Sequence, residues 1–265
     1  LLGQGVVARF DPETYSDAVA FARIGEGSLG GKARGLAFMN SMILKHRLYD
    51  KHANVRIMIP RSVVIATDYF DDFIRLNGLK YIISQEFSDE EILSEFVSST
   101  VPARLQQELK AYIQTVRTPL AVRSSSKLED SHYQPFAGIY STYMIPYVDN
   151  GDQMLRLLLK AVKSVYASVY FATSRAYLSS SQNLISEEKM AVIIQEVCGT
   201  EQDGLFFPTF SGVARSINYY PIGDEAPADG VCNIAMGLGK LVVDGGRTLR
   251  FSPRYPQKVL QTSTP

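Results

Sequence analysis

Cysteine, histidine and long apolar runs are all scarce in this sequence of 265 residues. The two cysteines, Cys198 and Cys232, lack metal-type spacing, which argues against a disulfide framework and suits a reducing cytosol. The three histidines, His46, His52 and His132, show no ligand spacing either. No apolar run approaches the roughly 20 residues that cross a bilayer, and the first residues carry no basic-then-apolar signal. We therefore expect a cytoplasmic protein that has no membrane segment.

An excess of charge of either sign is also absent. Lys plus Arg and Asp plus Glu number 27 each, so the net charge gives no reason to expect nucleic acid or an acidic membrane as a partner. Any phosphate group must therefore be bound by a local cluster of residues. The hydrophobic fraction of 46% and the charged fraction of 20% are typical of a globular protein. Because the chain opens on Leu1 without a methionine, we interpret it as part of a longer protein.

The chain changes in character along its length. Helical patterns dominate the first part, including a capping box at Ser88–Glu91 and one long amphipathic pattern over Gly151–Leu178. After the polar stretch Ser179–Asn183, strand patterns take over. These features predict an α+β fold, with a helix-rich lobe over residues 1–185 and a strand-rich lobe over residues 186–265. The strands expected in the second lobe cover 190–197, 212–220, 231–236 and 248–251.

A glycine-lysine turn is the first candidate site. Gly30 and Gly31 precede a predicted helix, so their backbone N–H groups lie near its N-terminus and Lys32 can meet a phosphate. Glycine also lets the backbone approach a ligand closely. The turn is not a Walker P-loop, because Ala33 stands where Ser or Thr is required. The alternative is an ordinary helix cap followed by a surface lysine.

An arginine-serine run is the second candidate site. Arg123 ends a short apolar strand and is followed by Ser124 and Ser125. A guanidinium group matches the geometry of phosphate oxygens, and the serine hydroxyl and amide groups add donors. An arginine at the end of a buried strand needs an anion, which is either a ligand or a neighbouring carboxylate. The alternative is therefore a structural ion pair with Glu129 or Asp130.

Two further segments are weaker candidates. The carboxylates of Glu129 and Asp130 could face a metal, but adjacent acids in a loop define no metal geometry and favour turn hydrogen bonds or salt bridges. Gln195, Glu196 and Val197 close an apolar strand. Their backbone could pair with the edge of an adenine ring, and the alternative is an ordinary strand end.

Several motifs follow one another along the chain in a fixed order. They occupy Leu29–Leu36, Ala121–Asp130, Phe136–Tyr143, Ala191–Val197, Ser211–Val213, Gly237–Gly239 and Val243–Gly245. In this order they resemble the nucleotide-binding domain of the pyruvate phosphate dikinase and phosphoenolpyruvate synthase family, with its glycine-lysine signature, its V-R-S-S-x-x-x-E-D stretch and its later strand motifs. The resemblance runs from about Ala18 to Pro253, nearly the whole chain.

The resemblance implies an ATP-grasp-like fold, truncated at the C-terminus, and a set of ATP-binding residues. Lys32 and Arg123 would be the catalytic residues that hold the ATP phosphates, together with Gly30, Gly31, Ser124 and Ser125. The loop from Ser124 to Gly138, which contains Glu129, would fold over them. Gln195, Glu196 and Val197 would line the adenine pocket. Mg²⁺ is expected as a second cofactor, with its ligands beyond this chain.

The resemblance also implies a function and partners. In this family the ATP-binding domain phosphorylates a histidine on a separate swivelling domain, and a third domain passes the phosphate to pyruvate. The parent protein would then be an ATP-dependent phosphotransferase of the dikinase type, and the isolated chain would be inactive. Related dikinases use an antibiotic or a glucan as acceptor, which is one alternative.

Three residues depart from the family pattern. Lys127 stands where small residues are usual, Arg215 replaces an apolar residue, and Lys240 replaces a glutamate after Gly-Leu-Gly. These departures motivate a second alternative from a different class of protein, a nucleotide-binding regulatory module that has lost catalysis.

Overall fold

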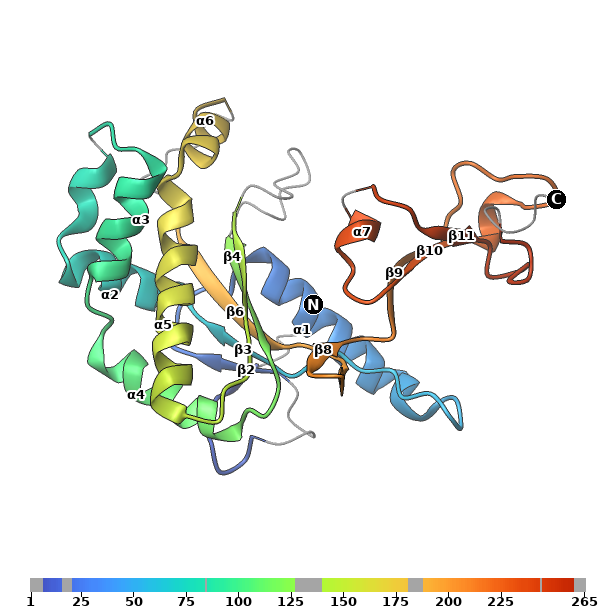
Figure 1. Cartoon of the computed structure of the whole chain (residues 1–265), viewed down its shortest axis with the longest axis horizontal. Helices are drawn as coiled ribbons and strands as arrows, with labels where there is room; N and C mark the ends of the chain where they lie inside the picture. Colours follow the sequence, from blue (N-terminus) through green and yellow to red (C-terminus); the bar gives the residue numbers. More distant parts are fainter. Residues whose placement is uncertain are drawn as a thin grey trace. The chain divides into compact units, whose positions relative to one another are not determined.

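A computed structural model describes residues 7–15, 21–83, 85–126, 140–180, 188–243 and 245–259, with the side chains of residues 179 and 180 left out. The chain divides into two compact units, Leu1–Val197 (unit 1) and Cys198–Pro265 (unit 2), and each is described by itself (Figure 1). The predicted lobe boundary at residues 185 and 186 falls outside the described residues. Across the described ranges, no helix has both the length and the apolar character needed to cross a bilayer.

Unit 1 is built on a mixed sheet with the strand order β1-β2-β3-β6-β4-β5. The three strands β1, β2 and β3 run parallel, whereas β6 pairs antiparallel with both β3 and β4, and β4 pairs antiparallel with β5. The strands are β1 Ala8–Arg9, β2 Phe21–Ile24, β3 Ser62–Ile65, β4 Leu120–Ser126, β5 Thr142–Ile145 and β6 Met190–Glu196.

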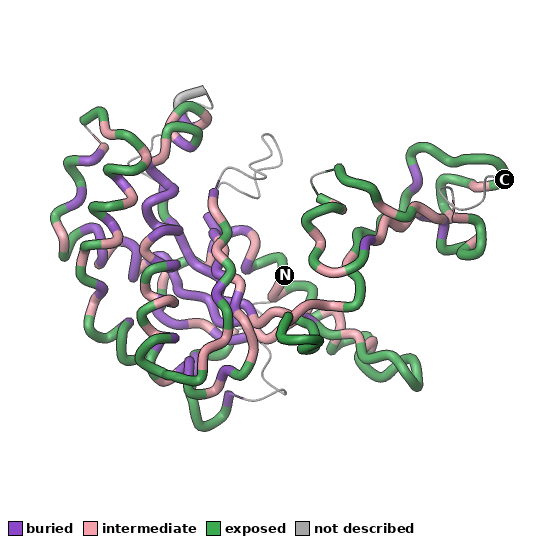
Figure 2. Tube along the Cα trace, in the orientation of Figure 1, coloured by how far each residue is buried: buried purple, intermediate pink, exposed green. Residues whose placement is uncertain are grey.

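Helices cover both faces of this sheet. The larger apolar core lies between one face and the helices α2, α3, α4 and α5, which are grouped on one side in Figure 1. A smaller apolar cluster joins the other face to α1. Because both faces are covered, β3 is buried along its whole length, and β6 is buried except for its last residue, Glu196 (Figure 2). The helical segments are α1 Gly30–Lys45, η1 Leu48–Asp50, α2 Thr67–Leu76, η2 Leu79–Ile83, α3 Asp89–Ser98, α4 Ala103–Thr115, α5 Gly151–Ala167, η4 Ser168–Tyr170 and α6 Ala172–Ser180.

The capping box predicted at the start of α3 is confirmed. The Ser88 hydroxyl accepts a hydrogen bond from the Glu91 N–H at 3.2 Å, and the Glu91 carboxylate accepts one from the Ser88 N–H at 2.8 Å. Both groups belong to residues only three positions apart, so the sequence specifies this helix start without help from distant residues.

The single long helix predicted over Gly151–Leu178 is wrong, because the structure breaks it after Ala167. The segment continues as the 3-10 helix η4, passes through an extended Phe171, and resumes as α6. Two serine hydroxyls bond carbonyl groups at the break. Ser168 donates to the Val165 carbonyl at 2.7 Å, and Ser174 donates to the Ser168 carbonyl at 2.6 Å. These bonds compete for carbonyl groups that a continuous helix would use.

Unit 2 is rich in strands. It contains a hairpin, β7 Thr200–Gln202 with β8 Leu205–Phe207, and an antiparallel sheet in the order β11-β10-β9. β10 and β11 lie close to the predicted ranges, whereas β9 ends at Arg215, five residues before the predicted end, and the strand predicted at 190–197 is β6 of unit 1. The mixed α and β composition of the chain is confirmed. The other segments of the unit are β9 Phe210–Arg215, η6 Pro227–Asp229, β10 Val231–Met236, α7 Lys240–Val243 and β11 Leu249–Phe251.

Unit 2 has few buried apolar side chains. Among its described residues, Ala235 is the only buried hydrophobic one, and most of the unit is exposed or half-buried (Figure 2). Polar contacts order its long β9–β10 connection instead. The Arg250 guanidinium pairs with both carboxylate oxygens of Glu225, at 2.5 and 2.6 Å. Asn218 donates a further hydrogen bond to Glu225 at 2.8 Å.

Candidate functional site

The glycine-lysine turn packs directly against the end of β4. Gly30 opens α1 with a φ of +71°, and a Cβ atom at this position would lie only 1.8 Å from the Ser125 carbonyl oxygen. Both facts require glycine, because L-residues rarely adopt positive φ and a methyl group would collide with the strand. The two segments predicted as separate phosphate-binding patches therefore meet at one place.

The buried hydroxyl of Ser125 fixes this contact. It accepts a hydrogen bond from the Ala33 N–H at 3.0 Å and donates one to the Leu29 carbonyl at 2.8 Å. One side chain thus satisfies a first-turn amide of α1 and the carbonyl that precedes the helix. The Gly30 N–H is bonded to the Ser28 hydroxyl at 3.3 Å. Within the described ranges the Gly31 N–H has no acceptor, so it remains available to an anion.

Lys32 reaches from the first turn of α1 to the same strand. Its ammonium nitrogen donates to the Ser124 hydroxyl at 3.1 Å, and its side chain is half-buried. Ser124 directly follows Arg123, so the lysine contacts a residue adjacent to the second predicted cation. The Gly30–Lys32 turn therefore contacts Ser124 and Ser125, the two residues that follow Arg123 on β4.

Arg123 lies half-buried on the face of the sheet that carries α1. Side chains alternate along a strand, which places Arg123 on the same face as Gln195 of β6. The Arg123 Nη1 donates to the Gln195 Oε1 at 3.3 Å. No carboxylate of the described residues pairs with this guanidinium, so its described partner is neutral. The alternative partners Glu129 and Asp130 lie outside the described residues, as does Gly138.

Glu196 and Gln195 face opposite sides of the sheet. The Glu196 carboxylate pairs with Arg61 (Nε to Oε1, 3.1 Å) and accepts a hydrogen bond from the Thr118 hydroxyl at 3.2 Å. The N–H groups of Glu196 and Val197 each bond a backbone carbonyl at 2.9 Å. These two N–H groups are therefore already engaged, and an adenine edge at this segment would have to use other backbone groups.

The side of the sheet around Glu196 is closed by packing. The Arg61 guanidinium lies 4.7 Å from the centre of the Tyr15 ring, which in turn contacts the Tyr112 ring edge to face. Burial raises the pKa of Tyr15 to about 12, although the neighbouring Arg61 acts to lower it. Tyr15 is thus a neutral core side chain at physiological pH, and it packs with Arg61 beside Glu196.

The Lys32 ammonium, the Gly31 N–H at the start of α1 and the Arg123 guanidinium of β4 are each groups that attract phosphate oxygens. By contrast, no group of three or more His, Cys, Asp or Glu side chains that could hold a metal occurs within the described ranges. One further participant escaped the sequence reasoning. Ser62 of β3 bonds Gln195, and strand alternation in the β3–β6 pair is the signal that could have found it.

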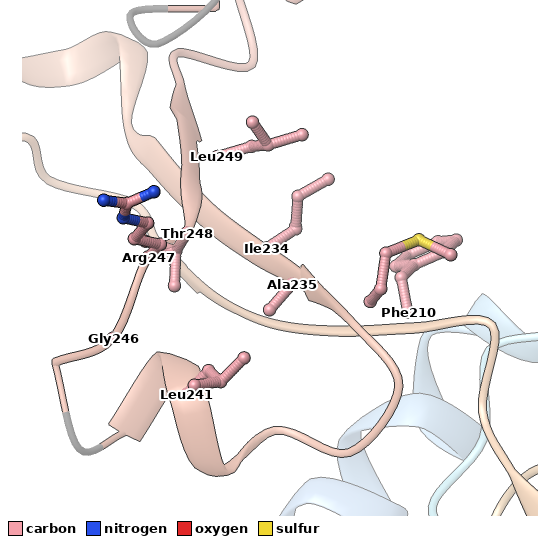
Figure 3. Close-up of a pocket in the computed structure, with 9 residues that line it drawn as sticks. Phe210, Ile234, Ala235, Leu241, Gly246, Arg247, Thr248 and Leu249 are labelled. Atoms are coloured by element: carbon pink, nitrogen blue, oxygen red, sulfur yellow. The ribbon is translucent and has the colours of Figure 1, made fainter.

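A separate hollow lies within unit 2. It has a volume of about 840 Å³ and is enclosed by β9, β10, α7 and the segment entering β11 (Figure 3). Its lining is mainly apolar, and the Arg247 guanidinium points away from Ile234 and Leu249. It contains none of the predicted phosphate-binding residues. The lining residues are Phe210, Ile234, Ala235, Met236, Leu241, Gly246, Arg247, Thr248 and Leu249.

Comparisons with known proteins agree on one family. The family model described as the pyruvate phosphate dikinase AMP/ATP-binding domain matches residues 26–259. An uncharacterized phosphotransferase of Bacillus subtilis, YvkC, is 27% identical over 234 residues, which cover 87% of this chain and 24% of the relative. The phosphoenolpyruvate synthase of Aeropyrum pernix is 24% identical over 238 residues, covering 82% of this chain and 25% of the relative.

A third relative matches this chain with similar identity and coverage. A probable phosphoenolpyruvate synthase of Staphylothermus marinus is 26% identical over 214 residues, covering 71% of this chain and 23% of the relative. The chain thus spans about a quarter of the length of the curated relatives that it matches.

Proposed function

The chain belongs to the pyruvate phosphate dikinase AMP/ATP-binding domain family, and from this premise we propose that unit 1 binds the phosphates of ATP at the Gly30–Lys32 turn and Arg123. One observation carries the proposal. The Lys32 ammonium is held 3.1 Å from the hydroxyl of Ser124, the residue next to Arg123, while α1 presents its N-terminus to the same strand.

Each residue has a distinct role in this proposal. The Gly31 N–H and the dipole of α1 attract phosphate oxygens, and Gly30 lets the backbone come close. Lys32 and Arg123 supply the charge that phosphoryl transfer needs, since this chemistry depends on positioning and on neutralising phosphate charge. Ser124 and Ser125 hold the two segments together. Bound ATP supplies the transferred phosphoryl group.

The wider function is part of the same proposal. The family and its relatives support an ATP-binding domain of a phosphotransferase resembling phosphoenolpyruvate synthase or pyruvate phosphate dikinase. We extend this to an ATP-grasp fold, to phosphorylation of a histidine on a swivelling domain, and to pyruvate as the final acceptor. Mg²⁺ belongs to this chemistry, but the described residues do not form a metal site, so we assign it no ligands and no step.

Calorimetric titration with ATP tests the phosphate site. Lys32→Ala and Arg123→Ala should each weaken binding by about tenfold, because each removes a charge-assisted hydrogen bond worth about 1.5 kcal/mol or more. Arg34→Ala is the matched control, since Arg34 is an exposed cation of the same helix turn and should leave the affinity unchanged. Equal affinities for the parent, Lys32→Ala and Arg123→Ala would show that the phosphate assignment is wrong.

The acceptor is tested in the longer protein that carries this chain. Formation of AMP and phosphoenolpyruvate from ATP and pyruvate is the expected reaction, measured with and without added phosphate. Dependence on phosphate would indicate a dikinase, and independence would indicate a synthase. AMP formation that needs neither pyruvate nor phosphate would point to another acceptor and would exclude the pyruvate proposal.

A further inference from the structure

We propose that Ser62 and Gln195 are positioning residues that hold the Arg123 guanidinium in the orientation used for phosphate binding. Neither side chain needs to touch the nucleotide in this role. The effect on ATP binding rests on the proposed function, whereas the orientation of Gln195 and Arg123 can be tested without a nucleotide.

The three residues form a continuous chain of hydrogen bonds across neighbouring strands. Arg123 of β4 donates to the Gln195 Oε1 at 3.3 Å. The Gln195 Nε2 donates to the Ser62 hydroxyl of β3 at 3.1 Å, and that hydroxyl donates to the Pro60 carbonyl at 2.9 Å. Gln195 stands opposite Ser62 in the register of β3 with β6, so the pairing of the strands brings these side chains together.

The direction of this chain is fixed at both ends. The Pro60 carbonyl can only accept a hydrogen bond, so the single hydroxyl proton of Ser62 is used there. The Ser62 oxygen must then accept from the NH₂ group of Gln195. A guanidinium can only donate, so the carbonyl end of the Gln195 amide must face Arg123. The amide has one satisfactory orientation although its two ends have nearly the same shape.

Burial makes this orientation costly to lose. Ser62 is fully buried, and Gln195 is 9% exposed, so water cannot replace a missing partner easily. Without the Ser62 hydroxyl, the Gln195 NH₂ group loses its acceptor and the amide is free to turn. A turned amide directs its N–H groups toward the guanidinium, which repels them. Arg123 must then leave the position in which it meets a phosphate.

The side chain that holds Arg123, the Gln195 amide, carries no charge. An amide oxygen orients Arg123 without cancelling its charge, whereas a carboxylate would form an ion pair with it. Gln195→Glu should therefore form an ion pair with Arg123 and weaken ATP binding. The same substitution should weaken binding of adenosine much less, because adenosine carries no phosphate.

The binding test uses Ser62→Ala in two backgrounds. In the parent, Ser62→Ala should weaken ATP binding about fivefold, the equivalent of one lost hydrogen bond, and should leave adenosine binding unchanged. In an Arg123→Met background it should have no further effect, since its action passes through Arg123. Ser62→Thr, which keeps the hydroxyl, should restore most of the affinity. Ser164→Ala is the control, because this buried hydroxyl bonds only the carbonyl of Lys160 in its own helix.

Two results of this test overturn the inference. One is an unchanged ATP affinity in Ser62→Ala. The other is a loss of the same size in both backgrounds, which would mean a general structural effect.

A second measurement separates this inference from the proposed function. If the parent chain does not bind ATP, the phosphate proposal fails, but the orientation of Gln195 can still be measured by NMR. Its side-chain NH₂ signals, identified by their loss in Gln195→Met, should exchange slowly with solvent in the parent and at least about tenfold faster in Ser62→Ala. Equal exchange rates would overturn the positioning role whether or not ATP binds.

Discussion

Gly30→Ala should uncouple α1 from β4 and so dismantle the phosphate site. In the parent, Gly30 has a φ of +71° and lies against the Ser125 backbone. A Cβ atom there would sit 1.8 Å from the Ser125 carbonyl oxygen, 2.4 Å from its carbonyl carbon and 2.6 Å from its hydroxyl oxygen. Ordinary van der Waals contact begins at 3.4 Å, so all three distances are too short. The helix start, the strand or both must move.

The magnitude follows from three contributions. Holding an alanine at positive φ costs about 1–2 kcal/mol. Overpacking against Ser125, which is held by its pairing with Ala191 of β6, costs about 1–3 kcal/mol. If the helix shifts to relieve the collision, the Ser125 hydroxyl loses its bonds to Ala33 and Leu29, which contribute about 1 kcal/mol each. The collision and the helix shift are alternatives, so a destabilisation of about 2–5 kcal/mol is expected, a large fraction of the roughly 5–15 kcal/mol that stabilises a typical domain.

Denaturant unfolding of the two variants Gly30→Ala and Gly35→Ala provides the measurement. Gly35 lies on the exposed face of the same helix, and no atom would meet an added Cβ within 4 Å. Gly35→Ala should therefore stabilise the chain by about 0.5–1 kcal/mol, because alanine favours a helix interior over glycine. The opposite signs of the two effects separate the collision from the general effect of replacing a glycine.

ATP affinity provides a second measurement on Gly30→Ala and Gly35→Ala. Gly30→Ala should weaken ATP binding under conditions in which the chain is still folded, while Gly35→Ala should not. If Gly30→Ala unfolds at the same denaturant concentration as the parent and binds ATP equally well, then the close contact between α1 and β4 does not exist in solution. The glycine-lysine turn and the arginine-serine run would then not meet at one place.

Two further predictions concern single polar groups. Ser125→Ala should destabilise unit 1 by about 2 kcal/mol in denaturant unfolding, since it leaves the Ala33 N–H and the Leu29 carbonyl without their buried partner, and an unchanged midpoint would contradict this. In unit 2, hydrogen bonding to Arg250 lowers the pKa of Glu225 from 4.5 to about 2. Because the folded-state pKa is the lower one, this carboxylate stabilises unit 2 above about pH 4.5, and its contribution is lost as the pH falls toward 2. Amide exchange in the β9–β10 connection should accelerate over that range in the parent and change less in Glu225→Gln, and equal pH profiles would exclude this role.

The sequence was sufficient to predict a helix start that depends on one residue pattern. It was not sufficient to predict a helix break at which several hydrogen bonds compete for the same carbonyl groups. The capping box at Ser88 and Glu91 depends on groups three residues apart, so the pattern was sufficient. The break after Ala167 depends on which carbonyl each serine hydroxyl selects. The amphipathic spacing continues through Ser168 and carries no information on these hydrogen bonds, so the predicted helix extended to Leu178 although α5 ends at Ala167.

The sequence also indicated some of the candidate site residues but not the contacts between them. Residue type and position made Lys32 and Arg123 candidates, beside an ordinary helix cap and a structural ion pair, and the order of the motifs along the chain favoured the phosphate-binding interpretation. Their meeting point depends on contacts between residues 92 positions apart, such as Lys32 with Ser124, which only the folded sheet defines. The opposite orientations of Gln195 and Glu196 were within reach of the sequence, since neighbours on a strand must face opposite sides.

The neutral partner of Arg123 connects the overall composition to the chemistry of the site. With equal numbers of acidic and basic residues, the chain has no general field that attracts a nucleotide. Attraction must come from cations whose charge is not cancelled nearby. A fold can hold an arginine in place with a carboxylate or with an amide, and only the amide leaves the full charge for a ligand. The bond from Arg123 to Gln195, supported by Ser62, meets that requirement within the described part of the chain.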